Sequence, residues 1–423
     1  MERQKVIIVG GGFAGINLIS KLRNDDAFEL ILVDLNNYHF FPPLIYQVAS
    51  GFMEPSAISY PFRKIISSDR NVRFRMGELQ RIVPHENKII LNNGTLQYDI
   101  LVLATGTESN YFGMDTVKQN AIPMKTISDA LAMRNKLLIN LEAATRIEDI
   151  NERKDLLTTV IAGAGPTGVE LAGMFAEMKK NIILKDYPEF SRRDQGEIIL
   201  IDGASTVLPP MSEKSQRYTT QKLKELGVKI MLNVNVKDFV DNIVYLSDGT
   251  TIQTKNLIWT AGVKAKTFEG FNPEDYGKGS RLLVNSYNKL FGYNNIYALG
   301  DTCLMNSDSN FPEGHPQLAQ AALQQAINLG NNLKKSNTED WKPFSYVDKG
   351  SMAIIGRNKA VADIPAFKKH FHGFFAWFIW VFIHIMSLVN FRNKLAAFYN
   401  WVISYISKDQ SFRMIIEPKE KVK

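Results

Sequence analysis

Two short glycine-rich segments are the residues of this chain best suited to hold phosphate groups. The first reads Gly-Gly-Gly-Phe-Ala-Gly over residues 10–15, and the second reads Gly-Ala-Gly-Pro-Thr-Gly over residues 163–168. In such a loop the first glycine permits a tight turn, the second lets the backbone approach a pyrophosphate, and the third allows close packing of helix on strand. The pyrophosphate then lies at the N-terminus of the helix. Two loops of this kind predict two bound dinucleotides.

Each loop is followed by an apolar strand that ends in a carboxylate. Asp34 ends the segment 28–34, and Asp202 ends the segment 197–202. Asp34 is expected to accept hydrogen bonds from the ribose hydroxyls of the first nucleotide. Asp202 would repel the 2′-phosphate of NADPH, so the second site is expected to take NADH. Glycines with a purely structural role are the alternative, and two complete patterns of strand, helix and acid argue against it.

A third segment, residues 294–301, is typical of a tightly bound flavin. It is an apolar strand that ends in Gly300 and Asp301. The glycine lets the backbone come close to the cofactor, and Asp301 can bond a ribityl hydroxyl of FAD. Two further strand ends, at residues 102–106 and 258–262, are expected where the chain crosses between two nucleotide-binding domains. The predicted fold class is α/β, with two Rossmann-like dinucleotide-binding domains.

With these segments in place, the chain resembles the two-dinucleotide flavoproteins of the disulfide reductase superfamily. The resemblance implies that the N-terminal unit binds FAD and that the inserted unit binds the pyridine nucleotide. Disulfide reductases and sulfide:quinone oxidoreductases need at least two redox cysteines near the flavin. This chain has one, Cys303, which we expect to be a small packing residue. Electrons must therefore leave the flavin by another route.

Two glutamines indicate the electron acceptor. Gln320 and Gln324 are four residues apart in a predicted helix, so both amides can face one small target. The pattern Ala319-Gln320-x-Ala322-x-Gln324 matches the AQxAxQ motif of the type II NADH dehydrogenases, which are single-subunit NADH:quinone oxidoreductases. The resemblance implies that both glutamines meet the quinone head-group, while Leu318 and Ala319 lie against the flavin. A solvated polar helix face is the alternative.

The resemblance extends from about residue 5 to residue 412. Residues 38–51 are similar to the HxFxPLLYQVA segment of that family, whose prolines and backbone line the isoalloxazine, and Pro43 is the best single candidate there. His39 and Tyr46 are core residues in the alternative interpretation. The residues expected to contact one of the two cofactors also include Gly10, Gly11, Gly12, Phe13, Ala14, Gly15, Leu79, Thr105, Gly106, Gly163, Gly165, Thr167, Gly168 and Gly262.

Glu170 follows the second glycine loop within the first turns of its helix. In the related enzymes this glutamate faces the junction of nicotinamide and flavin, so the resemblance implies that it relays a proton as quinone becomes quinol. A carboxylate near a helix N-terminus is also stabilised by the helix dipole alone. The two interpretations differ in pKa, because the dipole lowers it and a proton relay requires burial to raise it.

The composition changes after about residue 335. Residues 371–391 are apolar and aromatic, and a second aromatic segment follows at 395–406. The longest nearly continuous apolar run, 373–389, has 17 residues and includes His384, so two amphipathic helices lying in a membrane interface fit better than a span. The side chains expected at the depth of the lipid headgroups are Trp377, Trp380, Trp401, Tyr399 and Tyr405.

The net charge of +7 is concentrated in the same region. Residues 341–423 contain 13 Lys and Arg against 5 Asp and Glu, whereas the other 340 residues contain 37 against 38. A basic, aromatic and apolar end is suited to anionic lipid. No nucleic acid partner is expected, because the basic residues flank apolar helices instead of forming a stripe with exposed stacking aromatics. A buried core helix or a homodimer interface is the other alternative.

One position departs from the family pattern. Several relatives carry a lysine just before the glycine that opens the anchor segment, and here His372 precedes Gly373. His372 could donate a hydrogen bond to a quinone carbonyl or lie at the membrane edge. No metal site with His370 is expected, because no other cluster of histidine or cysteine is nearby.

These features predict three regions. The FAD-binding domain is expected over residues 1–124 and 260–337, the NADH-binding domain over 125–259, and the membrane-anchoring region over 338–423. The first strand begins within a few residues of Met1, so no signal peptide is expected. We therefore expect a peripheral, monotopic protein on the cytoplasmic face of the cell membrane.

The predicted reaction is the oxidation of NADH through FAD, with two electrons passed to ubiquinone or menaquinone in a respiratory chain. The quinone is expected to enter from the membrane side, between the anchor helices and the helix of Gln320 and Gln324, with Glu170 and Gln320 assisting its protonation. No proton pumping is expected, because the chain lacks multiple membrane spans. The alternatives are a soluble ferredoxin or rubredoxin reductase, a sulfide:quinone oxidoreductase relative, and a non-catalytic flavin or nucleotide sensor.

Overall fold

The computed structural model describes residues 3–190, 196–365, 369–407 and 412–416. They form two compact units, each assembled from three stretches of the chain. The first unit contains Met1–Phe40, Tyr60–Glu108 and Val263–Asp348. The second contains Phe41–Ser59, Ser109–Gly262 and Lys349–Lys423. The chain passes between the units near the strands β10 (Thr107–Ser109) and β19 (Val263–Ala265).

The first unit is built on a five-stranded parallel sheet, with strand order β22-β9-β1-β2-β5. Its strands are apolar on both faces, as expected of a parallel sheet that is covered on both sides. Val6, Ile7 and Ile8 of the central strand β1 are all fully buried. The strands span β1 Gln4–Val9, β2 Phe28–Asp34, β5 Val72–Met76, β9 Ile100–Leu103 and β22 Ile296–Ala298.

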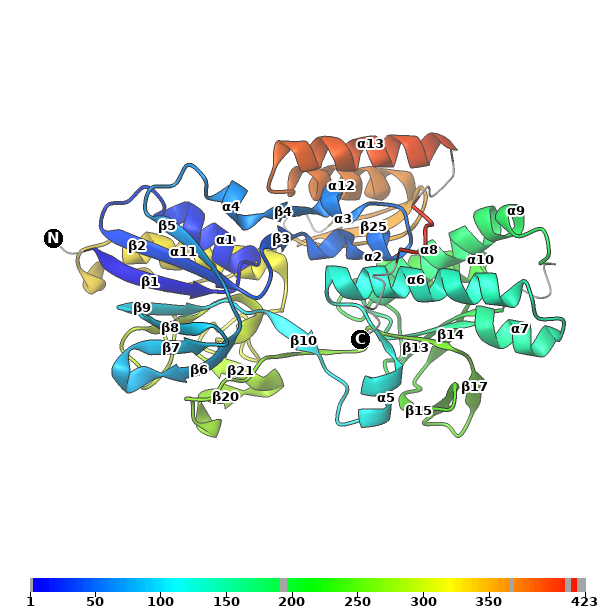
Figure 1. The fold of residues 1–423 in the computed structure, drawn as a ribbon, viewed down its shortest axis with the longest axis horizontal. Coiled ribbons are helices and arrows are strands. Elements are labelled where there is room, and N and C mark those ends of the chain that lie inside the picture. Colours follow the sequence, from blue (N-terminus) through cyan, green and yellow to red (C-terminus); the bar gives the residue numbers. More distant parts are fainter. Residues whose placement is uncertain (1–2, 191–195, 366–368, 408–411, 417–423) are drawn as a thin grey trace, which may run out of the picture. The chain divides into compact units, whose positions relative to one another are not determined.

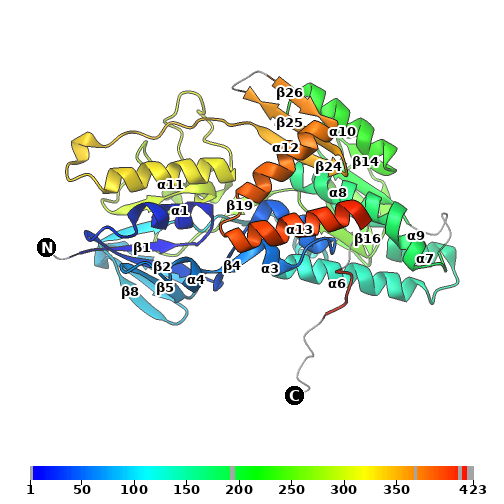
Figure 2. The ribbon, with the colours of Figure 1, turned by 90° about the horizontal axis from the view of Figure 1, so that it is seen from above.

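The helices α1 (Phe13–Leu22) and α11 (Ala319–Leu333) cover one face of this sheet and lie side by side (Figure 2). The other face packs against an antiparallel sheet of β6, β7 and β8. The remaining elements of the first unit are β3 Tyr38–Phe40, α4 Phe62–Ile65, β6 Leu79–Val83, β7 Lys88–Leu91, β8 Gly94–Gln97, β20 Tyr276–Gly277, β21 Arg281–Leu283 and β23 Cys303–Leu304.

The second unit repeats the design with a parallel sheet of order β11-β18-β12-β13-β14. The long helix α6 spans Ile127–Ala144. Thr126 caps it, because its side chain accepts the N–H of Asp129 while the Asp129 carboxylate accepts the N–H of Thr126. The strands span β11 Ile122–Pro123, β12 Thr159–Ala162, β13 Ile198–Asp202, β14 Val228–Leu232 and β18 Asn256–Trp259.

Further helices and a hairpin sheet complete this part of the second unit. A π-helical turn, Lys179–Ile183, continues directly from α8. The elements are α2 Ile45–Ala49, α3 Pro55–Ile58, α5 Asp115–Asn120, α7 Ile150–Leu157, α8 Pro166–Met178, α9 Leu184–Asp186, α10 Glu213–Glu225, β15 Val236–Val240, β16 Ile243–Leu246 and β17 Thr251–Gln253. The short strand β4 (Ser59–Pro61) runs from this unit into the first.

The C-terminal region adds an antiparallel sheet of β24 (Ser351–Gly356), β25 (Lys359–Ile364) and β26 (Lys369–His372). Two helices follow, α12 (Gly373–Met386) and α13 (Phe391–Ser407), and they lie side by side in Figure 1 and Figure 2. This agrees with the expectation of two separate helices. Among the described residues, no helix combines the length and apolar character needed to cross a bilayer.

Candidate functional site

The first glycine loop leaves room for a ligand at the start of α1. Gly10 has a φ of +105°, and a Cβ there would lie 2.2 Å from the carbonyl oxygen of Ala104. A Cβ on Gly15 would lie 1.9 Å from the carbonyl oxygen of Gly10. At Gly12, the N-cap of α1, a Cβ would meet nothing within 4 Å. The loop is thus close-packed on the protein side and open at the helix N-terminus, as a phosphate site requires.

Asp34 lies beside this loop. Its carboxylate accepts the backbone N–H of Gly11 at 2.7 Å and that of Asn36 at 2.8 Å. Burial raises the pKa of Asp34, and the two N–H donors oppose that rise. The ring of His39 is also buried, and its Nδ1 is 2.9 Å from the carbonyl oxygen of Gly11. His39 therefore supports the glycine loop from its buried side.

The predicted flavin aspartate lies in a short turn that two unpredicted residues hold in place. The backbone N–H of Gly300 donates to Oε1 of the buried Gln325 at 2.7 Å. The hydroxyl of Thr302, also fully buried, accepts the N–H of Gly106 at 2.9 Å and lies 3.3 Å from the Thr105 hydroxyl. The crossing at Thr105 and Gly106 is thereby joined to the turn that carries Asp301. These long-range contacts have no local sequence signal.

The two glutamines of α11 differ in their partners. The amide of Gln324 donates to the carbonyl oxygen of Val347 at 2.9 Å and accepts the N–H of Val347 at 3.0 Å. The Gln320 amide lies 3.5 Å from the Asp348 carboxylate. Gln324 thus fastens the segment after the helix. Both amides thus face adjacent residues, Val347 and Asp348, and their contact with a quinone head-group stays a prediction.

Cys303 behaves as the packing residue that the sequence predicted. Its side chain is 3% exposed and its Sγ lies 3.4 Å from both the Gly300 carbonyl oxygen and Gln325 Oε1. Burial raises the pKa of the thiol to about 12. A thiol in this setting stays protonated at neutral pH and is a poor nucleophile.

The second glycine loop repeats the arrangement of the first. Gly163 has a φ of +107°, and a Cβ there would lie 2.7 Å from the backbone of Thr260. A Cβ on Gly168 would lie 1.8 Å from the Gly163 carbonyl oxygen, whereas one on Gly165, the N-cap of α8, would meet nothing within 4 Å. The Asp202 carboxylate accepts the N–H of Ala164 at 2.6 Å. The second site therefore also has an open helix N-terminus and a nearby carboxylate.

The other residues that were expected to contact a cofactor lie on several different elements. Thr167 lies in the first turn of α8, and Gly262 follows β18 at the unit boundary. Leu79 is 5% exposed and belongs to the apolar core of the first unit, on the side of the β6 sheet. The remaining residues lie at element starts: Phe13 and Ala14 open α1, Leu318 is the N-cap of α11, Ala319 is its first residue, and Pro43 lies in the 3-10 turn Pro42–Leu44.

Glu170 is a buried carboxylate on α8. It is 8% exposed, and the backbone N–H of Ile354 on β24 lies 3.4 Å from its Oε1. Burial raises the pKa of Glu170 well above its usual range, and the Ile354 N–H and the Trp380 indole only partly oppose the rise. Burial therefore outweighs the helix dipole at this carboxyl group, and the role of Glu170 as a proton relay stays a prediction.

Further buried polar groups lie around Glu170, and of these Gln47 is the one that the sequence did not single out. Tyr46 is 1% exposed, and burial followed by the charge of Glu170 raises the pKa of its hydroxyl well above the usual range. Gln47, fully buried, donates from Nε2 to the Tyr46 hydroxyl at 2.8 Å. Its Oε1 has no hydrogen-bond partner within the described ranges. Trp380 packs on Tyr46 with ring centroids 6.3 Å apart.

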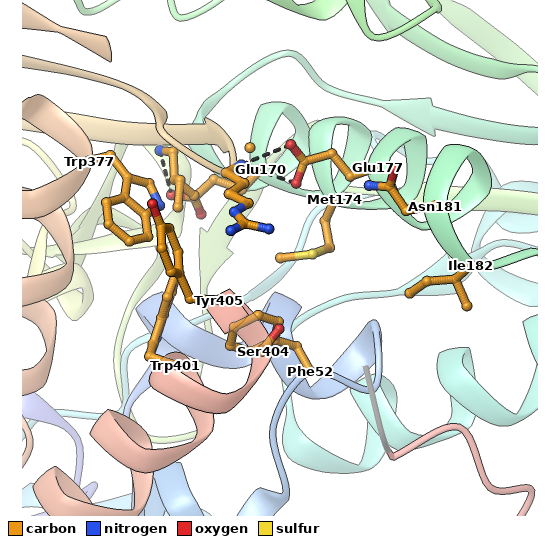
Figure 3. A pocket seen from close by; sticks show the side chains of 13 residues that line it. Phe52, Glu170, Met174, Glu177, Asn181, Ile182, Trp377, Trp401, Ser404 and Tyr405 are labelled. Atoms are coloured by element: carbon orange, nitrogen blue, oxygen red, sulfur yellow. Dashed lines mark hydrogen bonds between the residues drawn. The ribbon is translucent and has the colours of Figure 1, made fainter. Parts of the chain in front are cut away.

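A cavity lies beside Glu170 within the second unit (Figure 3). The volume of the cavity is about 70 Å³, which is room for several water molecules. Figure 3 shows Glu170, Met174 and Glu177 projecting from one side of α8 towards it. The opposite wall is aromatic and comes from α12 and α13: Trp377, Trp401 and Tyr405.

The C-terminal helices correct one expectation. Trp377, Trp380 and Trp401 were expected at the membrane interface, yet they are 7%, 0% and 7% exposed. They pack inward, with the rings of Trp377 and Trp401 5.6 Å apart. Tyr405 lies under the Arg357 guanidinium, 4.2 Å from it, and only Tyr399 of the five aromatic residues is largely exposed.

The outward faces of α12 and α13 are instead formed by phenylalanine and aliphatic residues. These exposed side chains are Phe374, Phe375, Phe378, Phe382, Ile383, Met386, Phe391, Leu395, Phe398, Val402, Ile403 and Ile406. Such a concentration of exposed apolar side chains marks an interaction surface. We call these residues the apolar face.

His372 lies at the end of β26, as the N-cap of α12. Its ring packs at a tilt of 32° against that of Tyr218 on α10, with the ring centroids 4.7 Å apart. The centroid of the His370 ring is 5.4 Å away. Across the described residues, no group of three side chains is arranged to hold a metal ion.

Comparisons with known proteins place this geometry among flavin and pyridine nucleotide enzymes. Residues 4–326 match the pyridine nucleotide-disulphide oxidoreductase family, and residues 349–408 match the NDH2 C-terminal domain. The chain is 34% identical over 422 residues to the type II NADH:quinone oxidoreductase Ndh of Mycobacterium tuberculosis, covering 96% of this chain and 89% of the relative. It is 27% identical to the mitochondrial internal alternative NAD(P)H-ubiquinone oxidoreductase A1 of Arabidopsis thaliana, covering 96% and 84%.

Solved structures show the same fold. The NDH2 structure from Plasmodium falciparum in complex with NADH superposes with a TM-score of 0.88 at 22% identity, covering 98% of this chain and 100% of that one. The sulfide:quinone oxidoreductase of Aquifex aeolicus superposes with a TM-score of 0.71 at 21% identity, covering 98% and 96%.

Proposed function

Because this chain belongs to the type II NADH:quinone oxidoreductase family, we propose that its two glycine loops hold the two nucleotides of that reaction. The enzyme uses FAD to oxidise NADH and to reduce a quinone, and it is a peripheral membrane protein. When bound, FAD supplies the acceptance of a hydride and the passage of two electrons. The observation that carries the proposal is the pair of open helix N-termini at Gly12 and Gly165 in one chain.

The first loop would bind FAD. Its open N-terminus at Gly12 is suited to the pyrophosphate, and Asp34 is placed to meet the ribose. Gln325 and Thr302 would act as positioning residues, because they fix the turn of Asp301 and the crossing at Gly106. The remaining predicted contacts of the first unit belong to the same site in this proposal.

The second loop would bind NADH. The N-terminus of α8 at Gly165 is suited to its pyrophosphate, and the Asp202 carboxylate would accept the ribose hydroxyls and repel a 2′-phosphate. Thr167 lies in the same first helical turn. The preference for NADH over NADPH thus rests on a negative charge beside the loop.

We propose that Glu170 supplies a proton to the quinone. Its buried position keeps the carboxyl group protonated to higher pH than an exposed glutamate, which is the form that can donate. Gln320 would contact the quinone head-group, as the family motif implies. Gln324 would act on that site through the segment that it fastens at Val347. His372 remains a candidate for a contact to a quinone carbonyl.

The apolar face would rest on the membrane. Its exposed phenylalanine and aliphatic side chains are suited to the boundary of headgroups and acyl chains, and basic residues of the C-terminal region would attract anionic lipid. The cytoplasmic side of the cell membrane is the location that we propose.

Steady-state kinetics of the detergent-solubilised protein test the function. NADH oxidation is measured with and without a short-chain quinone, and the NADPH rate and the Gln320→Ala variant are compared. We expect quinone-dependent oxidation of NADH, a much slower rate with NADPH, and a higher KM for quinone in the variant. Reduction of the flavin by NADH with no reoxidation by quinone would assign the electrons to a protein acceptor instead.

A further inference from the structure

The reaction consumes one proton from solution, and this proton needs a path. NADH and one proton reduce the quinone to quinol and leave NAD⁺, so the hydride brings two electrons and one of the two quinol protons. The other proton must come from the solvent. Glu170 is buried, so a donor at that position needs a group that reloads it after each turnover.

The cavity beside Glu170 contains a second carboxylate. Glu177 follows Glu170 by seven residues, which is two turns of α8 and about 10 Å along its axis. Residues at this spacing share one helix face, and both side chains line the cavity. The Glu177 side chain is 17% exposed, so it reaches solvent to a greater degree than Glu170.

The second unit holds the Glu177 carboxylate in place. Both of its oxygens accept the backbone N–H of Arg357, at 2.8 and 3.0 Å, and Lys359 Nζ lies 3.7 Å from Oε1. A Cβ on Gly356 would lie 2.5 Å from the same oxygen, so the glycine leaves the space that the carboxylate occupies.

The groups around Glu177 permit it to gain and lose a proton. Burial is the largest influence and raises its pKa, while the Arg357 N–H and the charges of Lys359 and Arg357 lower it. Tyr405 of α13 lines the cavity beneath the Arg357 guanidinium. Glu225 of α10 interacts electrostatically with Lys359. The positive charges do not fully offset the effect of burial, so the pKa of Glu177 is raised overall.

We propose that Glu177 is the solvent-side carboxyl group of a proton path that reloads Glu170 through waters in this cavity. Glu170 gives its proton to a quinone oxygen and becomes a carboxylate. The proton of Glu177 then passes through about three waters to Glu170, since waters in a chain are about 2.8 Å apart. Glu177 regains a proton from solvent, so each cycle takes up one proton. This inference rests on the proposed role of Glu170.

The Glu177→Gln variant tests the path in the full-length, detergent-solubilised holoenzyme. The amide can still accept from Arg357 but cannot exchange a proton. We expect quinone-dependent turnover to fall about tenfold or more, with a larger solvent isotope effect and partial rescue by a small weak acid such as hydrazoic acid. Oxidation of NADH by ferricyanide, which takes up no proton, should be unchanged. The matched control is Glu213→Gln, an 82% exposed carboxylate of α10, which should behave as the wild type.

A second variant changes the cavity without removing a carboxylate. Ser404→Leu should fill part of the water space and slow quinone reduction, again sparing the ferricyanide reaction. Quinone turnover at the wild-type rate in both Glu177→Gln and Ser404→Leu would overturn the path. If Glu170→Gln is slow while both of these variants turn over quinone normally, only the path is refuted and the donor role of Glu170 stands. Normal quinone turnover in Glu170→Gln would instead refute the donor role of Glu170 on which the path depends.

Discussion

Gly173 of α8 lies directly against the backbone of Ile355 on β24, so closely that a Cβ at Gly173 would be 1.7 Å from the Ile355 carbonyl oxygen. This approach brings the neighbouring N–H of Ile354 to the Glu170 carboxyl group. The C-terminal strand thereby becomes part of the environment that keeps Glu170 buried. Residues 170 and 354 are far apart in sequence and meet only because position 173 has no side chain.

Gly173→Ala should therefore destabilise the second unit. The new methyl group meets backbone rather than a mobile side chain, so α8 and β24 must separate. Overpacking of this kind costs about 1–3 kcal/mol. Thermal unfolding of the holoenzyme should show a lower Tm than the wild type, and quinone reduction should fall more than the ferricyanide reaction. An unchanged Tm would show that the helix and strand can separate without cost.

Alanine substitutions at the two open glycines should affect the two cofactors separately. A Cβ at Gly12 or Gly165 meets no protein atom within 4 Å, and both residues have extended backbone with negative φ. The fold should tolerate either change. Gly12→Ala should lower the FAD content of the purified protein, and Gly165→Ala should raise the KM for NADH about tenfold while FAD content stays full. Each variant is the control for the other, and loss of FAD from Gly165→Ala would contradict the assignment.

Asp202→Asn should weaken the preference for NADH. The amide oxygen can still accept one backbone N–H from the loop, but the charge that repels a 2′-phosphate is gone. Removing a repulsion of about 1–4 kcal/mol should raise the ratio of kcat/KM for NADPH to that for NADH about tenfold or more. Glu197→Gln, an exposed carboxylate near Lys229, should leave the ratio unchanged. A constant ratio in Asp202→Asn would assign the preference to another group.

The parts of the site that sequence could predict are those encoded locally. The glycine loops, Asp34 and Asp202 follow from spacing and residue type alone. Gln325 and Thr302 escaped prediction because their partners, Gly300 and Gly106, are defined only by the folded chain.

The tryptophans of the C-terminal helices show the limit of residue type as a guide. A Trp-rich apolar helix suggests a membrane interface, but type does not say which face turns inward. Trp380 is fully buried because Tyr46, more than 300 residues earlier in the chain, packs on it. No local pattern predicts that contact. The same limit applies to Glu170, since the strand that buries it begins at Ser351.

The raised pKa of Glu170 makes the stability of the wild type depend on pH. The native state holds this proton above pH 4.5, where the unfolded chain has lost it, so stability falls as pH rises from there towards the raised native pKa. Within that window, the free energy of unfolding falls by about 1.4 kcal/mol for each step of one in pH. Glu170→Gln removes this dependence, and its Tm should exceed that of the wild type at pH 8 and approach it near pH 4. An equal Tm difference at both pH values would show that Glu170 titrates normally.

Three phenylalanines of the apolar face offer a test of membrane binding that leaves the core intact. Phe375, Phe378 and Phe382 are 57%, 55% and 58% exposed and share one face of α12, opposite the buried Trp380. Burying one such side chain is worth about 1.5–3 kcal/mol, so their joint replacement by serine should weaken binding to phosphatidylglycerol vesicles at least 100-fold in a sedimentation assay. The ferricyanide reaction should persist.

The single variant Phe291→Ser, which removes an exposed phenylalanine of the first unit, is the control and should bind vesicles as the wild type does. Undiminished vesicle binding by the triple variant would refute the membrane role of these side chains. If it is accompanied by a change from dimer to monomer, the apolar face of α12 is an interface between two copies of the chain. The two outcomes differ because lipid binding scales with the apolar area exposed to the vesicle, whereas dimerisation depends on protein concentration.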